Sequence, residues 1–248
     1  MLLTSGGLES DTGLHRPLRS PGIYPEKMDI MNEAIEIPIL PLPNVVLFPH
    51  TLLPLHIFEP RYRKMTADCL QANRQLGVVL VRRAYGEEAK KNKSGMAPTH
   101  KILCVGNIVD HQLLPEGQFN IKVEGIHRAE LLEFLPSWPY RRAKVMPIKD
   151  VYDVADREEL MESRARLERE LTTLGEAAKR FAEMVERIMG QGQHPGILSD
   201  LVATHFVSDP YDRQSILSET DLIRRVDLTA IQMENLNRRV RRAQRKAT

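Results

Sequence analysis

Short apolar runs separated by prolines fill the sequence from residue 36 to residue 63, and this segment is nearly free of charge until its end. Proline lacks a backbone N–H and has a fixed φ, so neither a long helix nor a central strand can pass through such a segment. The pattern therefore predicts short extended segments at the edges and corners of a small β-structure. A helix is expected over residues 59–73, because the apolar positions there change to helical spacing and Pro60 suits a first helical turn. The prolines concerned are Pro38, Pro41, Pro43, Pro49, Pro54 and Pro60.

Further strands are predicted beyond this helix. Residues 76–81 form a continuous apolar run of strand length, which indicates a strand buried on both faces. Two longer apolar segments are separated by the tripeptide 115–117, Pro-Glu-Gly, and this arrangement predicts a β-hairpin. Residues 127–135 and 141–148 are expected to form two more strands. The chain up to about residue 149 is therefore predicted to be mostly β-structure with one helix.

From Val154 the pattern changes to apolar residues at alternating intervals of three and four, which predicts one long helix that extends to Ile188. A glycine-containing segment then ends this helix. A similar apolar seam recurs over residues 222–240, and we expect the first and last helices to pack against each other within one chain. The first seam consists of Leu160, Leu167, Leu171, Leu174, Ala178, Phe181, Val185 and Ile188.

Shorter helices are predicted between these two. Residues 197–206 have the apolar pattern of a second helix. Asp209, which stands before a proline, is expected to cap a third helix. Ser218 with Asp221 three residues later resembles a capping box for the fourth.

The composition is that of an ordinary water-soluble globular protein, with 42% hydrophobic and 27% charged residues. No apolar run approaches the roughly 18–20 residues that a membrane span needs, so membrane insertion is not expected. Residues 1–33 are predicted to be a flexible tail, and the charged segment 82–100 a mobile surface loop. The predicted organisation is thus a tail, a β-rich subdomain over residues 34–150 and an α-helical subdomain over residues 151–248.

Candidate metal ligands and nucleophiles are sparse. The two cysteines, Cys69 and Cys104, form no Cys-x-x-Cys motif, so neither a disulfide framework nor a zinc site is expected, and a cytoplasmic location is predicted. The eight histidines form no His-x-x-x-His pair, and we expect no metal and no cofactor. His100 lies four residues before Cys104, which leaves a cysteine hydrolase as one interpretation. Packing of buried thiols is the interpretation that we favour for both cysteines.

Residues 37–65, IPILPLPNVVLFPHTLLPLHIFEPRYRKM, resemble the opening of the N-terminal, substrate-binding domain of Lon proteases. The similarity continues through the hairpin to its end at Val123-Glu124-Gly125-Ile126-His127-Arg128, through PYRRAKV, and through the helical segments LSDLVATHF and IRRVDLTAIQM. It extends over roughly residues 35–240. The fold that this resemblance implies is α+β, with a PUA-like pseudo-barrel of β-strands and one helix followed by a helical bundle.

The resemblance implies a non-catalytic protein that binds polypeptides. A complete Lon protease continues into an ATPase module and a Ser-Lys peptidase domain, whereas this sequence ends at Thr248 and contains no Gly-Lys dipeptide, which a nucleotide phosphate loop requires. The expected partners are unfolded or exposed polypeptide segments or a partner protein, with a Lon-type protease among the candidates. Proline-interrupted strands could leave an open edge for such a partner. The residues predicted to contact it are Phe48, Pro49, Leu53, Phe58 and Tyr62.

The alternative function is an RNA-binding module. Residues 235–248 contain six basic residues and no acidic one, and relatives of the PUA-like fold bind RNA. Basic residues in the last turns of a helix also stabilise its negative end by about 0.3–1 kcal/mol each, and we favour this role for them. An aromatic content of only 5% and the absence of a recognisable stacking platform argue against RNA, which is not an expected partner. The candidate residues for this alternative are Arg238, Arg239, Arg241 and Arg242.

Overall fold

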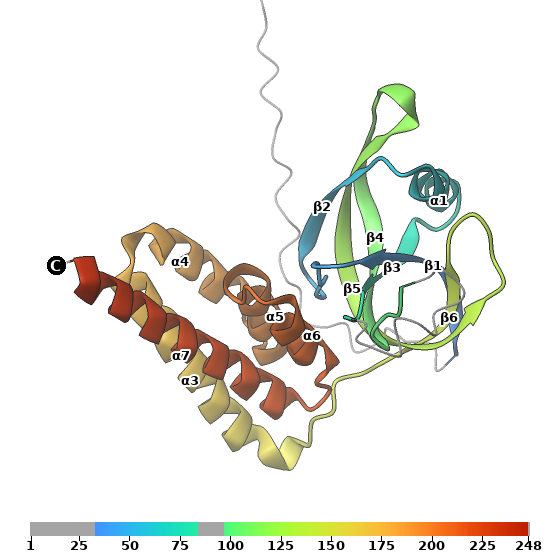
Figure 1. The fold of residues 1–248 in the computed structure, drawn as a ribbon. Coiled ribbons are helices and arrows are strands. Elements are labelled where there is room, and N and C mark those ends of the chain that lie inside the picture. The colour runs from blue at the N-terminus through green and yellow to red at the C-terminus, as the bar shows by residue number, and fades with distance from the viewer. Residues whose placement is uncertain (1–32, 84–96, 248) are drawn as a thin grey trace, which may run out of the picture.

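The computed structural model describes residues 33–83 and 97–247. It has an α+β architecture in which a six-stranded sheet with one helix comes first and the remaining helices follow (Figure 1). The predicted flexible tail, residues 1–33, lies outside the described residues except for its last residue, and the centre of the predicted loop at 82–100 lies outside them too. Both expectations therefore stay predictions.

The six strands form one sheet that closes on itself. Their order is β2-β5-β4-β3-β1-β6, and an additional pairing of β5 with β6 joins the two sides of the sheet. Strands β1 and β3 are parallel, and the other pairs are antiparallel. Because the closure involves β5, strand β2 remains as an additional strand beside it. The elements are β1 (Ile35–Leu42), β2 (Leu52–Ile57), α1 (Pro60–Gln71), β3 (Gln75–Leu80), β4 (Ile102–Leu113), β5 (Phe119–Leu135) and β6 (Arg142–Pro147).

Strand β5 is long because it changes its partner halfway along. Its first part pairs with β2 over residues 119–124, its last part pairs with β6 over residues 129–135, and β4 lies along its other side. The predicted hairpin, which is β4 and β5, and the predicted strands β3 and β6 are confirmed. The prediction of a separate strand at residues 127–135 is wrong, because these residues are the end of β5.

The change of partner takes place at Gly125. Its N–H donates to the carbonyl oxygen of Thr51, and its own carbonyl accepts from the N–H of His50, both at 2.9 Å. A Cβ atom on Gly125 would lie 2.0 Å from the carbonyl oxygen of Phe48. Since no side chain fits there, only glycine allows the segment before β2 to approach β5 so closely.

The helices α3 and α7 form a parallel pair at the side of the molecule away from the sheet (Figure 1). The side-chain amide of Asn237 donates to the carbonyl oxygen of Glu170, and that of Gln244 donates to the carbonyl oxygen of Ala177, so the two helices keep a constant offset. Their apolar residues share one buried cluster, which confirms the predicted packing of the first helix on the last. The helices are α3 (Arg157–Ala177), α4 (Ala182–Gln191), α5 (Pro195–Phe206), α6 (Pro210–Ser218) and α7 (Leu222–Ala247).

The prediction of one long helix from Val154 to Ile188 is wrong. Helix α3 ends at Ala177, because the next residue is extended, with φ −138° and ψ 91°. Phe181 and the apolar residues of α4 then fold back onto the same buried cluster as Leu174. The apolar residues of one continuous sequence pattern thus belong to two helices. Residues 176–180 contain no glycine or proline that would indicate the break between them.

The predicted N-caps are partly confirmed. The Asp209 carboxylate accepts hydrogen bonds from the N–H groups of Tyr211 and Asp212, at 2.7 and 3.1 Å, so it caps α6 as expected. Helix α7 is capped by Asp221, whose carboxylate accepts from the N–H of Ile223 at 3.0 Å. The predicted capping box is therefore wrong, since Ser218 is the last residue of α6.

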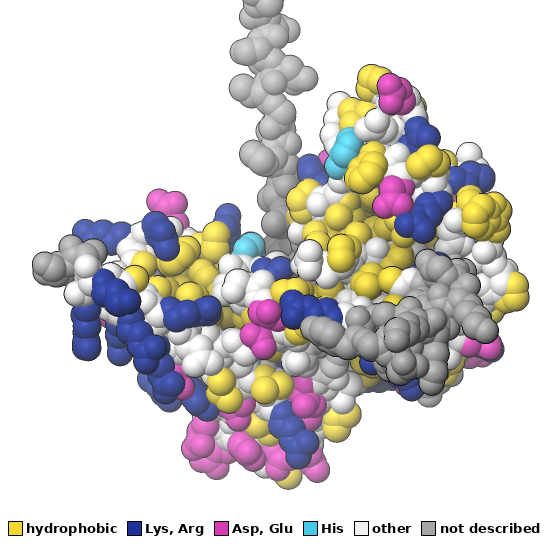
Figure 2. Space-filling model, in the orientation of Figure 1, with side chains coloured by type: hydrophobic (Ala, Val, Ile, Leu, Met, Phe, Trp, Pro, Cys, Tyr) yellow, Lys and Arg dark blue, Asp and Glu magenta, His cyan; other side chains and the backbone are white. Residues whose placement is uncertain are grey.

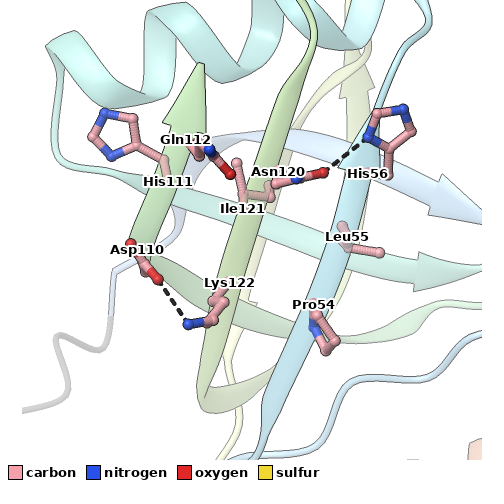
Figure 3. Close-up of a pocket in the computed structure, with 9 residues that line it drawn as sticks. All are labelled: Pro54, Leu55, His56, Asp110, His111, Gln112, Asn120, Ile121 and Lys122. Carbon is pink, nitrogen blue, oxygen red and sulfur yellow. Dashed lines mark hydrogen bonds and ion pairs between the residues drawn. The ribbon is translucent and has the colours of Figure 1, made fainter. Parts of the chain in front are cut away.

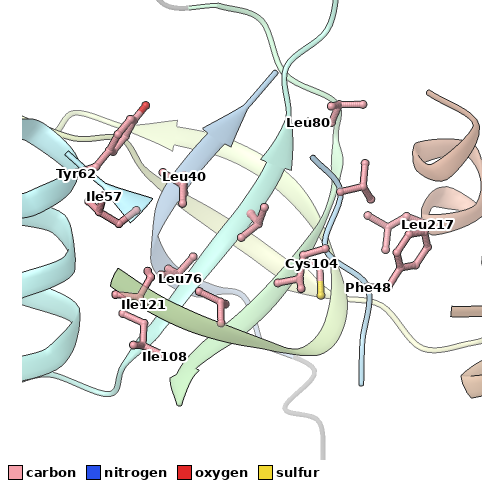
Figure 4. Close-up of a cluster of buried hydrophobic side chains, with 14 of the residues drawn as sticks. Leu40, Phe48, Ile57, Tyr62, Leu76, Leu80, Cys104, Ile108, Ile121 and Leu217 are labelled. Carbon is pink, nitrogen blue, oxygen red and sulfur yellow. The ribbon is translucent and has the colours of Figure 1, made fainter. Parts of the chain in front are cut away.

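Strand β3 is buried on both faces, which explains its continuously apolar sequence. Leu76, Val78 and Leu80 contact the cluster that also contains residues of α1 and of the helical part, whereas Val79 faces the interior of the closed sheet. The predicted burial of this strand on both faces is confirmed. Figure 4 shows the first cluster as it extends from Tyr62 of α1, across the sheet, to Leu217 of α6, so one core joins the two parts of the molecule.

A buried ion pair links the sheet to the helices at the same place. Arg128 of β5 and Asp200 of α5 form a bidentate pair, with Nη1–Oδ2 at 3.0 Å and Nη2–Oδ1 at 2.5 Å, and their side chains are 4% and 2% exposed. The Arg128 Nε also donates to the carbonyl oxygen of Leu217 at 3.0 Å. Burial alone would lower the pKa of Arg128, but the facing carboxylate raises it above its ordinary value, so Arg128 keeps its charge in the core.

A second ion pair fixes the connection between β6 and α3. Arg225 of α7, which is fully buried, donates from Nη1 to Asp150 Oδ1 at 2.7 Å and to the carbonyl oxygen of Glu219 at 3.1 Å. Burial raises the pKa of Asp150, but its hydrogen bonds and ion pair with Arg225 outweigh that effect and lower the pKa below its ordinary value. The start of α7 is thereby tied to the segment that follows the sheet.

Replacement of Asp200 is expected to destabilise the whole chain. Asp200→Ala leaves the buried Arg128 guanidinium without its counter-charge, which should lower the free energy of unfolding by about 3–5 kcal/mol. Urea denaturation followed by circular dichroism measures this change. The matched control is Lys122→Ala, which removes the exposed pair with Asp110 and should cost far less stability, because solvent screens that pair. Equal losses in the two variants would contradict the role given to the buried pair.

Candidate functional site

Strand β2 presents one face to the core and the other to solvent. Leu53 and Leu55 are half-buried against the core cluster and Ile57 is buried, whereas Leu52, Pro54 and His56 are exposed. This alternation follows from the two-residue period of a strand. Phe58 continues the exposed row directly after the strand, and its ring lies over that of His56 with the ring centres 6.0 Å apart. Leu52 and Phe58 are large apolar side chains that are 46% and 61% exposed.

The backbone groups of β2 also alternate, between β5 and the outside of the sheet. In an antiparallel pair, residues that exchange hydrogen bonds alternate with residues that do not. The bond from the Gly125 N–H to the Thr51 carbonyl fixes which residues of β2 face β5. The pairing of β5 with β4 agrees with this assignment. There the Leu114 N–H donates to the Gln118 carbonyl at 2.8 Å, so even-numbered residues at the start of β5 face β4 and odd-numbered residues face β2. The residues whose backbone groups point away from β5 are therefore Leu52, Pro54 and His56.

The outer side of β2 is a free edge within the part of the chain that the structure describes. No hydrogen bond from another described residue reaches the backbone groups of Leu52, Pro54 or His56. Pro54 fits this position because it has no N–H to leave unpaired. We refer to the outward backbone groups of these three residues as the β2 edge.

The tip of β4 has a free side too, but it is less regular. The pairing of β4 with β3 stops at Asn107, which lies opposite the first residue of β3, and beyond it β4 extends alone beside β5 with a register shift between Ile108 and Asp110. Such a bulge twists a strand and makes it a poor template for a further strand. The pairing of β2 with β5 has no register shift from Leu52 to Ile57. The β2 edge is therefore the better candidate for strand addition.

A shallow depression of about 460 Å³ lies beside the β2 edge, across β2, β5 and β4 (Figure 3). Two polar contacts line it: His56 Nδ1 with Asn120 Oδ1 at 2.9 Å, and Lys122 Nζ with Asp110 Oδ2 at 2.8 Å. The hydrogen bond and charge of Lys122 lower the pKa of Asp110, so this pair is charged at neutral pH. The lining residues are Pro54, Leu55, His56, Asp110, His111, Gln112, Asn120, Ile121 and Lys122.

The exposed apolar side chains are unevenly distributed over the molecule. Figure 2 shows them gathered on the β-rich part, whereas basic side chains line the C-terminal end of α7 and acidic ones gather where α3 begins. Helix α3 carries Glu158 and Glu159 in its first turn, and α7 carries Arg245 and Lys246 in its last turn, which suits the helix dipoles. Most of the large exposed apolar side chains among the described residues lie in the β-rich part, and the others lie at Val151, Tyr152, Val154, Met161 and Ile231.

The five residues predicted to contact a polypeptide do not lie on one surface. Phe48, Pro49 and Tyr62 are buried, and Phe48 lies in the core beside Gly125. Leu53 is half-buried on the inward face of β2, and only Phe58 has a large exposed surface. Of the five, Phe58 is the residue that a ligand could reach most easily, and it lies beside the three outward residues of β2. The alternation in LLPLHI, with its proline at an outward position, was the signal that could have found them.

Three of the four candidate arginines come together at a second depression of about 410 Å³. Arg238, Arg239 and Arg242 line it, but so do Asp209 and Asp212 of the α6 start, while Arg241 does not. Arg238 also pairs with Glu234 on its own helix. Carboxylates therefore share the surface that would have to attract a nucleic acid.

The structure removes the interpretation of Cys104 as a nucleophile. Its side chain is fully buried in the core, and burial raises the pKa of its thiol far above the ordinary value. Burial also raises the pKa of Cys69 to about 11. His100 lies against Tyr211 instead, with ring centres 6.0 Å apart. The favoured expectation, that both cysteines are buried packing residues, is confirmed.

Within residues 33–83 and 97–247, no group of three or more His, Cys, Asp or Glu side chains is arranged to hold a metal ion. None of the helices there combines the length and the apolar character that a membrane crossing requires.

The sequence matches known proteins over most of its length. The family model of the ATP-dependent protease La (LON) substrate-binding domain matches residues 36–235. The Lon protease of Anaeromyxobacter dehalogenans is 30% identical over 226 residues, which is 90% of this chain and 25% of that protein. Lon protease 2 of Myxococcus xanthus is 31% identical over 206 residues, which is 82% of this chain and 24% of that protein. The chain thus spans about a quarter of the length of these curated relatives.

Two solved structures share the fold. The N-terminal domain of the Mycobacterium avium complex Lon protease superposes with a TM-score of 0.59 at 14% identity, covering 81% of this chain and 98% of that domain. A Lon N-terminal domain protein from Xanthomonas campestris gives a TM-score of 0.52 at 17% identity, covering 78% of this chain and 95% of that one. At these identities the likeness concerns the fold alone.

The buried thiols should be inert in the folded protein. Because burial raises the pKa of Cys69 to about 11 and that of Cys104 still further, neither thiol is ionised at pH 8. Ellman's reagent is expected to react with both only after denaturation, giving two thiols per chain. A rapid stoichiometric reaction in the absence of denaturant would show that one thiol is accessible and contradict this assignment.

Proposed function

The chain belongs to the family of LON substrate-binding domains, and on that premise we propose that it binds extended polypeptide segments along the β2 edge. The observation that carries the proposal is the free outer side of β2, whose carbonyl and N–H groups no other described residue uses. A polypeptide in extended conformation can pair with these groups as an additional strand. Backbone pairing of this kind is independent of the bound sequence, which suits a domain that must accept many different polypeptides.

Apolar contacts supply the remaining binding energy in this proposal. A strand added beside β2 places every second side chain on the outer face, next to the exposed row of Leu52, Pro54, His56 and Phe58. Burial of a side chain the size of leucine or phenylalanine contributes about 1.5–3 kcal/mol. Two such contacts contribute about 3–6 kcal/mol before the loss of rotational and translational freedom is subtracted.

We propose a role in binding rather than in catalysis for this chain. The matched family model describes a substrate-binding domain, and the relatives that contain a similar segment are Lon proteases. Unfolded or exposed polypeptide segments are the proposed ligands, and a Lon-type protease is a proposed partner. A cytoplasmic location remains a prediction from the cysteine content.

The finer description of the fold is part of the same proposal. The closed sheet with α1 against it agrees with a PUA-like pseudo-barrel, and α3 to α7 agree with a helical bundle. We place the boundary between the two subdomains near residue 150, where the sheet has ended and Asp150 meets Arg225. The RNA-binding alternative is not favoured, because Asp209 and Asp212 line the same depression as the candidate arginines.

Loss of the exposed apolar side chains at the β2 edge is expected to weaken polypeptide binding. The variant Leu52→Ser with Phe58→Ser keeps the backbone groups but removes the apolar row, so the dissociation constant for a permanently unfolded, carboxymethylated model protein should rise at least about tenfold. Fluorescence anisotropy of the labelled model protein measures it.

The matched control is Ile231→Ser, which removes an apolar side chain that is 41% exposed on α7. This variant should bind like the unaltered protein. The proposal is overturned if the unaltered protein shows no saturable binding at tens of micromolar, or if the control variant loses as much affinity as the double variant.

A further inference from the structure

Pro54 stands at the centre of the β2 edge, between the outward residues Leu52 and His56. The edge therefore offers the carbonyl oxygens of all three residues but the N–H groups of only the outer two. Pro54 costs the sheet nothing on its inner side, because its backbone groups point away from β5. Its effect is confined to whatever pairs with the edge from outside.

We propose that Pro54 makes the β2 edge selective for foreign polypeptide segments over a second copy of this chain. The inference rests on the proposed function, since it assumes that strands are added at this edge. It names the preferred occupant, an extended segment of about five residues, and assigns the discrimination to one residue.

A foreign segment loses one backbone hydrogen bond at this edge. In antiparallel pairing, the first, third and fifth residues of the segment face His56, Pro54 and Leu52, and each can donate its N–H to the opposite carbonyl. The carbonyl of the third residue finds no donor, because Pro54 has no N–H. That carbonyl lies at an open edge, where water can reach it, so the loss is small.

A second copy of β2 loses more. When two such strands pair about a twofold axis at the centre of the edge, Pro54 stands opposite Pro54 of the other copy, and Leu52 stands opposite His56. Both central hydrogen bonds are then absent, because the carbonyl of each Pro54 points at the nitrogen of the opposite Pro54, which carries no hydrogen. Prolines on edge strands are known to prevent edge-to-edge association in this way. The same residue thus leaves the edge open to a ligand and closes it to self-association.

The side chains of the segment are also constrained. Its first, third and fifth side chains lie on the outer face beside His56, Pro54 and Leu52 respectively, so apolar residues at alternate positions fit best. Proline is excluded from these three positions, because each must donate its N–H. Proline is tolerated at the second or fourth position, because the backbone groups of these residues point to solvent. The substrate class is therefore a short extended segment with alternating apolar residues.

The test uses the full chain and a fluorescein-labelled peptide of nine residues in which valine and threonine alternate. Pro54→Val restores an N–H at the centre of the edge and should tighten peptide binding about three- to tenfold, the effect of one backbone hydrogen bond. It should also make the chain self-associate in sedimentation velocity runs at concentrations where the unaltered protein is monomeric. Pro43→Val, an exposed proline outside the strands, is the control and should change neither property.

A second measurement needs no variant of the protein. N-methylation of single peptide residues removes one N–H at a time and should weaken binding at three positions spaced by two. A reduced peptide bond removes one carbonyl at a time and should weaken binding at only the outer two of those positions. Sensitivity to carbonyl loss at the central position as well would overturn the role of Pro54.

The outcomes separate the inference from the proposed function. If neither the unaltered protein nor Pro54→Val binds the peptide, the proposed function fails. If the unaltered protein binds with the spacing of two, but Pro54→Val neither tightens binding nor self-associates, the inference about Pro54 fails and the proposed function stands. Should Pro54→Val not fold, as judged by its circular dichroism, the peptide modifications decide the matter on the unaltered protein.

Discussion

The structure depends on the way in which β5 divides its length between two partners. Each side of a strand can pair with only one neighbour at a time. On the side of β5 that faces away from β4, β2 is the neighbour up to Glu124 and β6 is the neighbour from Ala129 onward. Gly125 makes the change possible, because the backbone at Phe48 comes too close for any side chain. The pairing with β6 closes the sheet, and the pairing with β2 leaves an outer edge. Closure and the free edge are thus two consequences of one arrangement.

The same short segment of β5 also fixes the helices. Arg128 follows Gly125 by three residues and reaches out of the sheet to Asp200 and to the Leu217 carbonyl. A buried ion pair of this kind contributes little net stability over an apolar pair, but it is costly to break, so it favours one relative placement of sheet and helices. The core that runs from α1 to α6 supplies the cohesion. The β2 edge is therefore presented by a well-supported scaffold.

Local sequence patterns predicted most of the helices and strands. The apolar run of β3, the Pro-Glu-Gly turn before β5, Pro60 at the start of α1 and Asp209 at the start of α6 each have a local cause that the sequence displays. The break after Ala177 has none, because both halves of one apolar seam pack on the same cluster. The candidate site was only partly predictable. Burial of Phe48 and Tyr62 depends on contacts with distant strands, whereas the outward position of Pro54 agrees with a rule that can be applied to the sequence alone.

Amide hydrogen exchange along β2, resolved by residue with NMR, tests the account most directly. In the free protein the N–H groups of Leu53, Leu55 and Ile57 should be protected by β5, while those of Leu52 and His56 should exchange rapidly. Saturating unfolded polypeptide should slow the exchange of Leu52 and His56 and leave the other three unchanged. Slow exchange of Leu52 and His56 already in the free protein, or ligand-induced protection in α7 instead of β2, would contradict it.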